Sequence, residues 1–139
     1  MNGLTHSDFA PTFASVLVVD DDPDALLVLT GLLTALGAER VCPAGSAEEA
    51  LSVLQRESFS AILCDYRLRG MTGVELLERL RTAGDMTPML LLSGVPDERD
   101  VLRAARFAQV DFFPKPFRFD ELRQSLARLA TPLELRAAA

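Results

Sequence analysis

Short apolar runs alternate along this chain with longer segments in which apolar residues recur every three or four positions. The runs have the length of strands and cover residues 15–19, 40–43, 60–64, 89–92 and 110–113. Helical spacing follows each of them, over about residues 22–36, 46–54, 72–84, 98–108 and 120–129. Five such alternations predict right-handed crossovers and an α/β fold, in which helices cover both faces of a parallel sheet.

Capping residues mark the starts of three predicted helices. Asp22 has the side chain of an N-cap and stands before a proline, a residue that fits the first helical turn. Ser46 with Glu49, and Thr72 with Glu75, have the spacing of a capping box, in which each side chain binds the backbone N–H of the other residue. These positions are therefore the predicted helix starts.

Length and composition favour a single globular domain. The 139 residues, 49% of them hydrophobic, are enough for one sizeable core, which we expect over residues 15–130. Residues 1–14 lack periodicity and are predicted to form a flexible extension, and residues 131–139 a short tail. No basic residue precedes Arg40 and no apolar run reaches membrane-spanning length, so we expect a cytoplasmic protein without membrane contact.

Charge and cysteine content argue against two further classes of protein. The net charge of −6 argues against direct binding of nucleic acid through its phosphates. Cys42 and Cys64 lack the spacing of metal ligands and lie in apolar runs, so we expect reduced thiols in the core. A solvated basic surface is the expectation for the arginines at positions 67, 69, 99, 103 and 106.

Polar side chains follow four of the five predicted strands at the point where each strand ends. Asp20 and Asp21 come after the first strand, Asp65 after the third, Ser93 after the fourth and Lys115 after the fifth. Ligands of open α/β sheets bind beyond the carboxyl ends of the strands, so these groups are expected to meet there. Carboxylates, water and a backbone carbonyl are ligands that Mg²⁺ accepts. The sequence therefore predicts a site for a divalent cation with an ammonium group beside it.

Two features of these residues bear on the chemistry. Neighbouring aspartates repel, and a divalent cation makes Asp20 and Asp21 tolerable together, whereas Asp22 is explained by its role as a cap. Lys115 is the single lysine of the chain, against 13 arginines. A compact ammonium serves as a point charge toward a carboxylate or phosphoryl oxygen, and differs in this from a planar guanidinium.

Four stretches, in this order and spacing, resemble the receiver domain of two-component response regulators: VLVVDDDPD, AILCDYRLRGMTGVELL, LLLSGVP and DFFPKPF. The resemblance covers about residues 15–130. It implies a flavodoxin-like, doubly wound sheet of five parallel strands, (βα)5, in the order 2-1-3-4-5. It also implies a phospho-accepting role in signal transduction, with the phosphoryl group taken from a sensor histidine kinase or a histidine phosphotransfer protein.

The resemblance assigns a role to each residue that matches the family's motifs. Asp65 is by this match the phospho-acceptor. The cofactor it implies is Mg²⁺ or Mn²⁺, held by Asp21 directly, by Asp20 through water, by Asp65 and by the backbone carbonyl of Arg67.

Further matches concern the response to phosphorylation. Ser93 takes the position of the switch hydroxyl, Lys115 that of the phosphoryl-binding lysine, and Phe112 that of the aromatic switch residue. Phe112 is equally well explained as a core phenylalanine. Pro116 is the residue that in this family usually follows a cis peptide bond.

Arg67 and Val95 match the two positions that flank the path of a hydrolytic water. Valine has no polar atom, and arginine only donates hydrogen bonds, so neither accepts a proton from that water. We therefore expect slow self-dephosphorylation. The resemblance implies that the protein catalyses only its own phosphorylation and dephosphorylation.

The chain departs from the family pattern in three places. Arg69 stands four residues after the acceptor, where the family usually has proline, and Thr72 stands where an acidic residue or asparagine is common. Residues 107–110 read FAQV where an Ala-Gly-Ala stretch is expected before the fifth strand. We expect altered loop shapes and a fourth helix that differs from the standard partner surface.

Two alternatives remain open at the level of the sequence. Asp20 and Asp22 have the D-x-D spacing of haloacid-dehalogenase-like phosphatases, although no late acidic pair completes that site. A degenerate receiver that acts as a phosphorylation-independent scaffold is the other alternative, against which all five key positions are filled. The resemblance implies a downstream protein target that the sequence does not identify, and it allows a homodimer that forms on phosphorylation.

Overall fold

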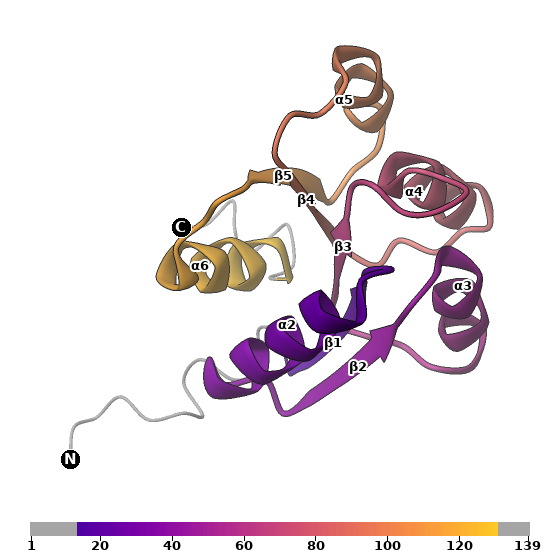
Figure 1. Ribbon diagram of the computed structural model, residues 1–139. Coiled ribbons are helices and arrows are strands. Elements are labelled where there is room, and N and C mark those ends of the chain that lie inside the picture. The colour runs from indigo at the N-terminus through magenta and orange to yellow at the C-terminus, as the bar shows by residue number, and fades with distance from the viewer. Residues whose placement is uncertain (1–13, 131–139) are drawn as a thin grey trace.

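A computed structural model describes residues 14–130, in which five strands and five helices alternate (Figure 1). The predicted extension over residues 1–14, Ala14 apart, and the predicted tail over residues 131–139 lie outside the described residues. The elements are β1 (Ser15–Val19), α2 (Pro23–Ala35), β2 (Arg40–Ala44), α3 (Ala47–Arg56), β3 (Ala61–Asp65), α4 (Gly73–Thr82), β4 (Met89–Ser93), α5 (Glu98–Ala104), β5 (Val110–Pro114) and α6 (Phe119–Ala130).

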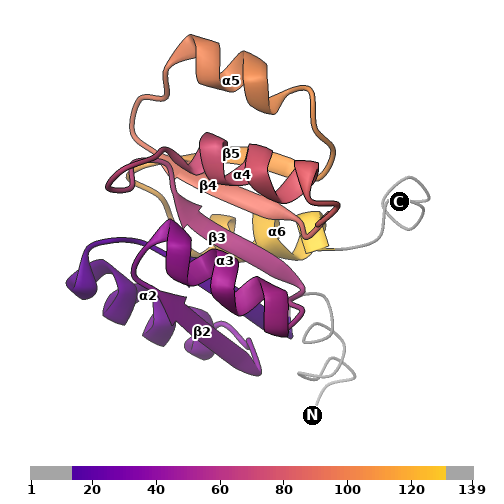
Figure 2. The same cartoon turned by 90° about the vertical axis from the view of Figure 1, so that its right-hand side faces the viewer.

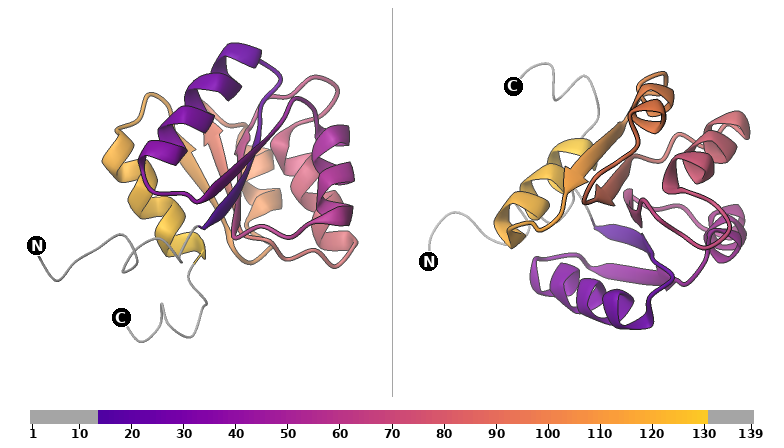
Figure 3. Two further views of the ribbon diagram at one scale, coloured as in Figure 1. Left: turned by 90° about the horizontal axis from the view of Figure 1, so that it is seen from below. Right: turned by 45° about the horizontal axis from the view of Figure 1, so that its top comes forward.

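All five strands pair in parallel, in the order β2-β1-β3-β4-β5, which confirms the predicted strand order. Helices α2 and α6 cover one face of the sheet, and α3, α4 and α5 lie on the other (Figures 1 and 3). The carboxyl ends of the strands therefore point to one common edge, as Figure 2 also shows from the side.

Strand β1 shows why a continuous apolar run forms a central strand here. Leu17 and Val19 pack into the cluster under α3 and α4, while Val16 and Val18 pack into the cluster under α2 and α6. All four side chains are fully buried. Because successive side chains of a strand point to opposite faces, a strand that is covered on both sides needs apolar residues at every position.

The helix starts agree with the predicted caps, with one correction. Asp22 caps α2 by accepting a hydrogen bond from Asp24 N at 3.0 Å, and Thr72 forms a complete capping box on α4. Ser46 caps α3, but the reciprocal bond that the predicted capping box requires is absent. The Glu49 carboxylate accepts a hydrogen bond of 2.6 Å from Gly45 N, one residue earlier.

Helix α5 is shorter than the spacing predicted: it ends at Ala104 rather than near residue 108. After it the chain turns to pack Phe107 on the core, and Gln109 adopts a positive φ of 60°. The guanidinium of Arg81 on α4 donates hydrogen bonds to the backbone carbonyls of Ala108 (3.2 Å) and Gln109 (3.3 Å). These bonds satisfy two loop carbonyls and hold the chain where it turns toward β5.

Within residues 14–130, none of the helices has the length and apolar character needed to cross a membrane. Both cysteines are free; Cys64 is buried in the core as expected, whereas Cys42 on the edge strand β2 is only half-buried.

Gly73, the first residue of α4, tests how closely this helix approaches the sheet. A Cβ there would collide with the Leu91 side chain and lie 3.1 Å from the carbonyl oxygen of Asp65. We expect Gly73→Ala to lower the free energy of unfolding by about 1–3 kcal/mol, as overpacking of a core does. Urea unfolding followed by circular dichroism measures the change.

Gly31 on α2 is the matched control, because a Cβ there meets nothing within 4 Å. Alanine is the better helix former, so Gly31→Ala should raise the free energy of unfolding by about 0.5–1 kcal/mol. Equal changes in the free energy of unfolding for the two substitutions would show that helix propensity, and not the close approach of α4 to the sheet, determines the effect at Gly73.

Candidate functional site

The four strands β1, β3, β4 and β5 place their last or next residues at one edge of the sheet. Asp20 follows β1, Asp65 ends β3, Ser93 ends β4 and Lys115 follows β5. Backbone bonds continue the pairing past the strand ends: Lys115 N donates to Ser93 O at 3.0 Å. The parallel topology therefore brings together the groups that the sequence placed at separate strand ends.

The Lys115 ammonium donates a hydrogen bond of 2.6 Å to Asp65 Oδ1. The Asp65 side chain is only 13% exposed, whereas that of Lys115 is 42% exposed. The lysine therefore reaches from the rim toward a largely enclosed carboxylate and fixes the position of one of its oxygens. The peptide bond between Lys115 and Pro116, at the point where the chain leaves β5, is cis.

Asp20 is the most buried carboxylate of the site, with 5% of its surface exposed. Its Oδ1 accepts a hydrogen bond of 3.0 Å from Asp22 N. Burial raises the pKa of Asp20, and the nearby charges of Asp65 and Asp21 raise it further, while the bond from Asp22 N and the charge of Lys115 oppose this. Ionised Asp20 is therefore held at a cost in free energy.

Asp21 is half-buried beside this carboxylate, and a second cation approaches it from the rim. Arg69 Nε lies 4.0 Å from Asp21 Oδ2, although the Arg69 side chain is 91% exposed. So exposed a pair contributes little to stability. Asp22, in contrast, is turned away from the cluster to cap α2.

The donor groups at this edge suit a hard, oxygen-ligated cation. Within residues 14–130, no three His, Cys, Asp or Glu side chains are arranged to hold a metal ion by themselves. Mg²⁺ does not require such a set, because it is usually bound through one or two carboxylates and keeps several waters. A backbone carbonyl such as that of Arg67 supplies an oxygen of the same kind. Asp20 and Asp21 therefore fit this cation, and their mutual repulsion favours one.

A small cavity of about 100 Å³ opens beside Asp65 and Lys115. It combines a carboxylate, a hydroxyl residue and an ammonium with exposed backbone at Gly94, a combination suited to a small anionic group. Its lining residues are Asp65, Tyr66, Arg67, Leu92, Ser93, Gly94 and Lys115.

Three predicted residues lie at the margin of this cavity or outside its lining. Arg67 is at the rim, with its guanidinium carbon 5.5 Å from the centroid of the Tyr66 ring. Val95 is 81% exposed in the loop after Ser93. Phe112 is half-buried against the core, and its ring meets that of Tyr66 edge to face at 6.2 Å between centroids.

The sequence interpretation missed Tyr66, which is 3% exposed and lines the cavity directly after Asp65. The available signal was that the chain has a single tyrosine and that it interrupts an apolar strand end. Arg103 also differs from the expected solvated surface, since it forms ion pairs with Glu78 and Asp100. No spacing along the chain predicts these contacts between helices.

Comparison with known proteins gives a consistent result. The family model described as the response regulator receiver domain matches residues 16–127. The response regulator protein TodT of Pseudomonas putida is 32% identical over 121 residues. This match takes in 86% of the chain and 52% of TodT, so the chain spans about half the length of that curated relative.

Solved structures with this fold include the chemotaxis response regulator CheY4 of Vibrio cholerae, with a TM-score of 0.74 and 27% identity. The match covers 84% of this chain and 98% of CheY4. The receiver domain of the sensor histidine kinase PA1611 of Pseudomonas aeruginosa matches with a TM-score of 0.73 and 27% identity, over 85% of this chain and 98% of that domain. That structure has a magnesium ion coordinated in its active-site cleft.

The burial of Asp20 generates a prediction about the metal-free protein. We expect Asp20→Asn to raise the melting temperature at neutral pH in the presence of a chelator by a few degrees. Asparagine keeps the acceptor for Asp22 N but removes a charge that burial disfavours.

The raised pKa of Asp20 also predicts how the stabilisation by Asp20→Asn depends on pH. A folded-state pKa above the unfolded value means that wild type loses stability as pH rises through the folded pKa. The advantage of Asp20→Asn should therefore be largest at neutral pH and vanish in acid, where wild-type Asp20 is protonated. Asp22→Asn is the control and should melt like wild type, because Asn and Asp cap equally well. A lower melting temperature for Asp20→Asn at neutral pH would contradict the assignment of a costly charge.

Proposed function

Because the chain belongs to the response regulator receiver domains, we propose that Asp65 accepts a phosphoryl group from a phosphohistidine in two-component signalling. The observation that carries this assignment is the Lys115–Asp65 contact of 2.6 Å at the mouth of a small polar cavity. One oxygen of the carboxylate is held by the ammonium, and the acidic pair Asp20 and Asp21 follows the neighbouring strand β1. A carboxylate with a fixed cation and a cation-binding pair near it is suited to act as a nucleophile toward phosphorus.

The proposed transfer forms a bond between an Asp65 carboxylate oxygen and phosphorus while the phosphorus–nitrogen bond of the donor imidazole breaks. The imidazole keeps the electron pair of that bond and takes up a proton. Lys115 stabilises the negative charge that spreads over the phosphoryl oxygens. Asp20, Asp21, Asp65 and the Arg67 carbonyl would hold Mg²⁺ or Mn²⁺, which supplies further positive charge when bound.

Ser93 is the proposed hydroxyl that binds the new phosphoryl group. It ends β4, is 6% exposed and lines the same cavity as Asp65. A hydrogen bond from its hydroxyl to a phosphoryl oxygen would draw the following loop inward. Phe112, half-buried on the neighbouring strand β5, is the aromatic residue proposed to respond.

The phosphodonor is proposed to be a sensor histidine kinase or a histidine phosphotransfer protein. Helix α2 begins directly after the acidic cluster and exposes Leu27 and Val28, which are 75% and 63% exposed. An apolar hollow between α2 and β2 is lined by Pro23, Leu26, Leu27, Thr30 and Pro43. This surface adjoins the site and is the proposed contact for the donor.

The alternative of a phosphomonoester-cleaving enzyme has no support in the geometry. Its D-x-D motif requires Asp20 and Asp22 in one site, but the Asp22 carboxylate binds Asp24 N as the cap of α2. The chemistry proposed here is confined to the protein's own phosphorylation and slow dephosphorylation. The proposal includes a downstream protein target and a homodimer that forms on phosphorylation.

Asp65→Asn should abolish labelling by a small phosphodonor such as acetyl phosphate, because an amide is not a competent nucleophile. Mass spectrometry of the intact protein, or radiolabel that is stable in acid and lost in base, measures the reaction. Asp22→Asn is the matched control, a second Asp→Asn change beside the site, and should be labelled like wild type. Retained labelling of Asp65→Asn would refute the assignment of the acceptor.

The phosphoryl group should be lost slowly, because neither Arg67 nor Val95 can accept a proton from an attacking water. Val95→Glu combined with Arg67→Asn should speed the loss by about tenfold or more, by positioning that water. Decay of labelled protein in Mg²⁺ buffer after removal of the donor gives both rates.

Met86→Glu is the control for the added charge, because Met86 is half-exposed before β4, at the opposite edge of the sheet. It should leave the decay unchanged. Loss of the label within seconds in wild type would rule out the assigned roles of Arg67 and Val95.

A further inference from the structure

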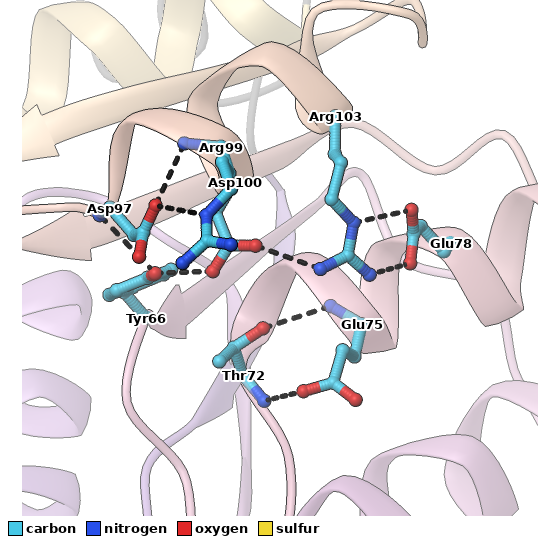
Figure 4. A network of polar contacts seen from close by, with 8 residues as sticks. All are labelled: Tyr66, Thr72, Glu75, Glu78, Asp97, Arg99, Asp100 and Arg103. Carbon is cyan, nitrogen blue, oxygen red and sulfur yellow. Dashed lines mark hydrogen bonds and ion pairs between the residues drawn. The ribbon is translucent and has the colours of Figure 1, made fainter.

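A polar network joins the residue after Asp65 to helix α5 (Figure 4). The Tyr66 hydroxyl donates a hydrogen bond to Asp100 Oδ2 on α5 and accepts one of 3.4 Å from Asp97 N. Asp97 is the N-cap of α5, and Asp100 lies in its first turn. Burial and the bond to Asp100 raise the pKa of the Tyr66 hydroxyl, so it remains a donor at neutral pH. One hydroxyl thus holds both the cap and the first turn of the helix.

The same network fastens α5 to α4. Arg103 on α5 donates a hydrogen bond of 2.9 Å to Asp100 Oδ1 and a second, of 3.0 Å from Nε, to Glu78 Oε2. Its Nη2 also pairs with Glu78 Oε1, so the guanidinium and the Glu78 carboxylate meet as a two-pronged pair. Asp100 therefore lies between Tyr66 and Arg103, as Figure 4 shows.

These polar contacts matter because α5 has little apolar anchorage. Of its seven residues only Asp100 and Ala104 are buried, and Leu102 is 70% exposed. In Figures 1 and 2 the helix lies at the outer margin of the fold, beyond α4. A short helix with one buried apolar side chain depends on hydrogen bonds for its position, so the Tyr66 contact has a large share in placing it.

Tyr66 itself is fixed by β4 and by the first residue of α4, directly after the proposed phosphorylation site. Its backbone N donates to Leu92 O at 2.8 Å, and its carbonyl accepts from Gly73 N at 2.7 Å. Its ring packs edge to face on Phe112. Phe112 has no hydroxyl group. The phenolic hydroxyl on this side of the sheet is therefore that of Tyr66, which directly follows β3 and is the one tyrosine of the chain.

We propose that the Tyr66 hydroxyl, through Asp97 and Asp100, holds α5 in the arrangement of the unphosphorylated protein, and that phosphorylation moves α5 by loosening this contact. The inference rests on the proposed phosphorylation of Asp65. Only three residues, Gly94, Val95 and Pro96, separate Ser93 from Asp97. A phosphoryl group that draws Ser93 inward therefore pulls directly on the residue whose backbone N binds the hydroxyl.

Tyr66 is in this proposal a positioning residue. Thermodynamic linkage predicts how removal of its hydroxyl changes the affinity for a phosphoryl analogue. If the contact is stronger in the unphosphorylated arrangement, its loss favours the phosphorylated one and tightens the binding of a phosphoryl analogue. We expect Tyr66→Phe to bind beryllofluoride about tenfold more tightly than wild type in Mg²⁺ buffer, the factor that a hydrogen bond to a charged group supplies. Asp100→Asn should shift the affinity in the same direction by less, because an amide oxygen still accepts from the hydroxyl.

Glu57→Gln is the matched control, since Glu57 also pairs with an arginine, Arg40, but lies far from α5 at the end of α3. Its beryllofluoride affinity should equal that of wild type in calorimetry. A lower melting temperature of Tyr66→Phe with unchanged affinity would overturn the proposal, because it would leave the hydroxyl a purely structural role.

Fluorescence supplies a second readout that a structural role does not move. The chain contains one tyrosine and no tryptophan, so its intrinsic emission reports on Tyr66 alone. A carboxylate acceptor quenches tyrosine emission, and we expect the emission to rise when beryllofluoride binds and the contact to Asp100 loosens. Unchanged emission, in a sample where calorimetry shows binding, would overturn the inference. Absence of binding to wild type would instead refute the proposed function itself.

Discussion

The ion pair between Lys115 and Asp65 is the constraint on which the rest of the site depends. It joins the ends of β3 and β5, which are not neighbours in the sheet, across the end of β4. A carboxylate that is 13% exposed and lies near Asp20 and Asp21 needs a fixed positive charge, because water alone solvates it poorly. The ammonium supplies that charge and at the same time leaves the second carboxylate oxygen unclaimed by the lysine. One contact thus links the ends of two strands and compensates the charge of a largely buried carboxylate.

The three consecutive aspartates after β1 have different surroundings, because each negative charge needs its own compensating group. Asp20 is buried at the sheet edge, Asp21 is half-buried beside it, and Asp22 turns outward to cap α2. A different group compensates each negative charge. The N–H of Asp22 binds Asp20, the guanidinium of Arg69 lies 4.0 Å from Asp21, and the N–H of Asp24 binds Asp22. Because the first two receive little compensation from the protein, this corner of the molecule favours a bound cation.

The strand order could be predicted through the resemblance to a known family, whereas the meeting of the polar groups follows from local signals. Apolar runs define the strands, and parallel topology then fixes which residues share an edge. The contacts that the sequence did not predict depend on distances between elements. Glu49 accepts a hydrogen bond from Gly45 N instead of completing a box on Ser46, and Arg81 on α4 binds carbonyls of the loop that follows the early end of α5. Spacing along one segment contains no information about a partner on another.

Tyr66 shows the same limit at the site and explains how α5 is held with only one buried apolar side chain. Its being the one tyrosine of the chain marks it in the sequence, but only the fold shows that its hydroxyl reaches Asp100 and Asp97. Hydrogen bonds are directional and few, whereas apolar packing spreads over many contacts, so a helix held by the former can change position when one bond is lost. The β4–α5 loop connects this lightly packed helix to Ser93 by three residues. The part of the fold with the least apolar anchorage is therefore tied most directly to the cavity beside Asp65.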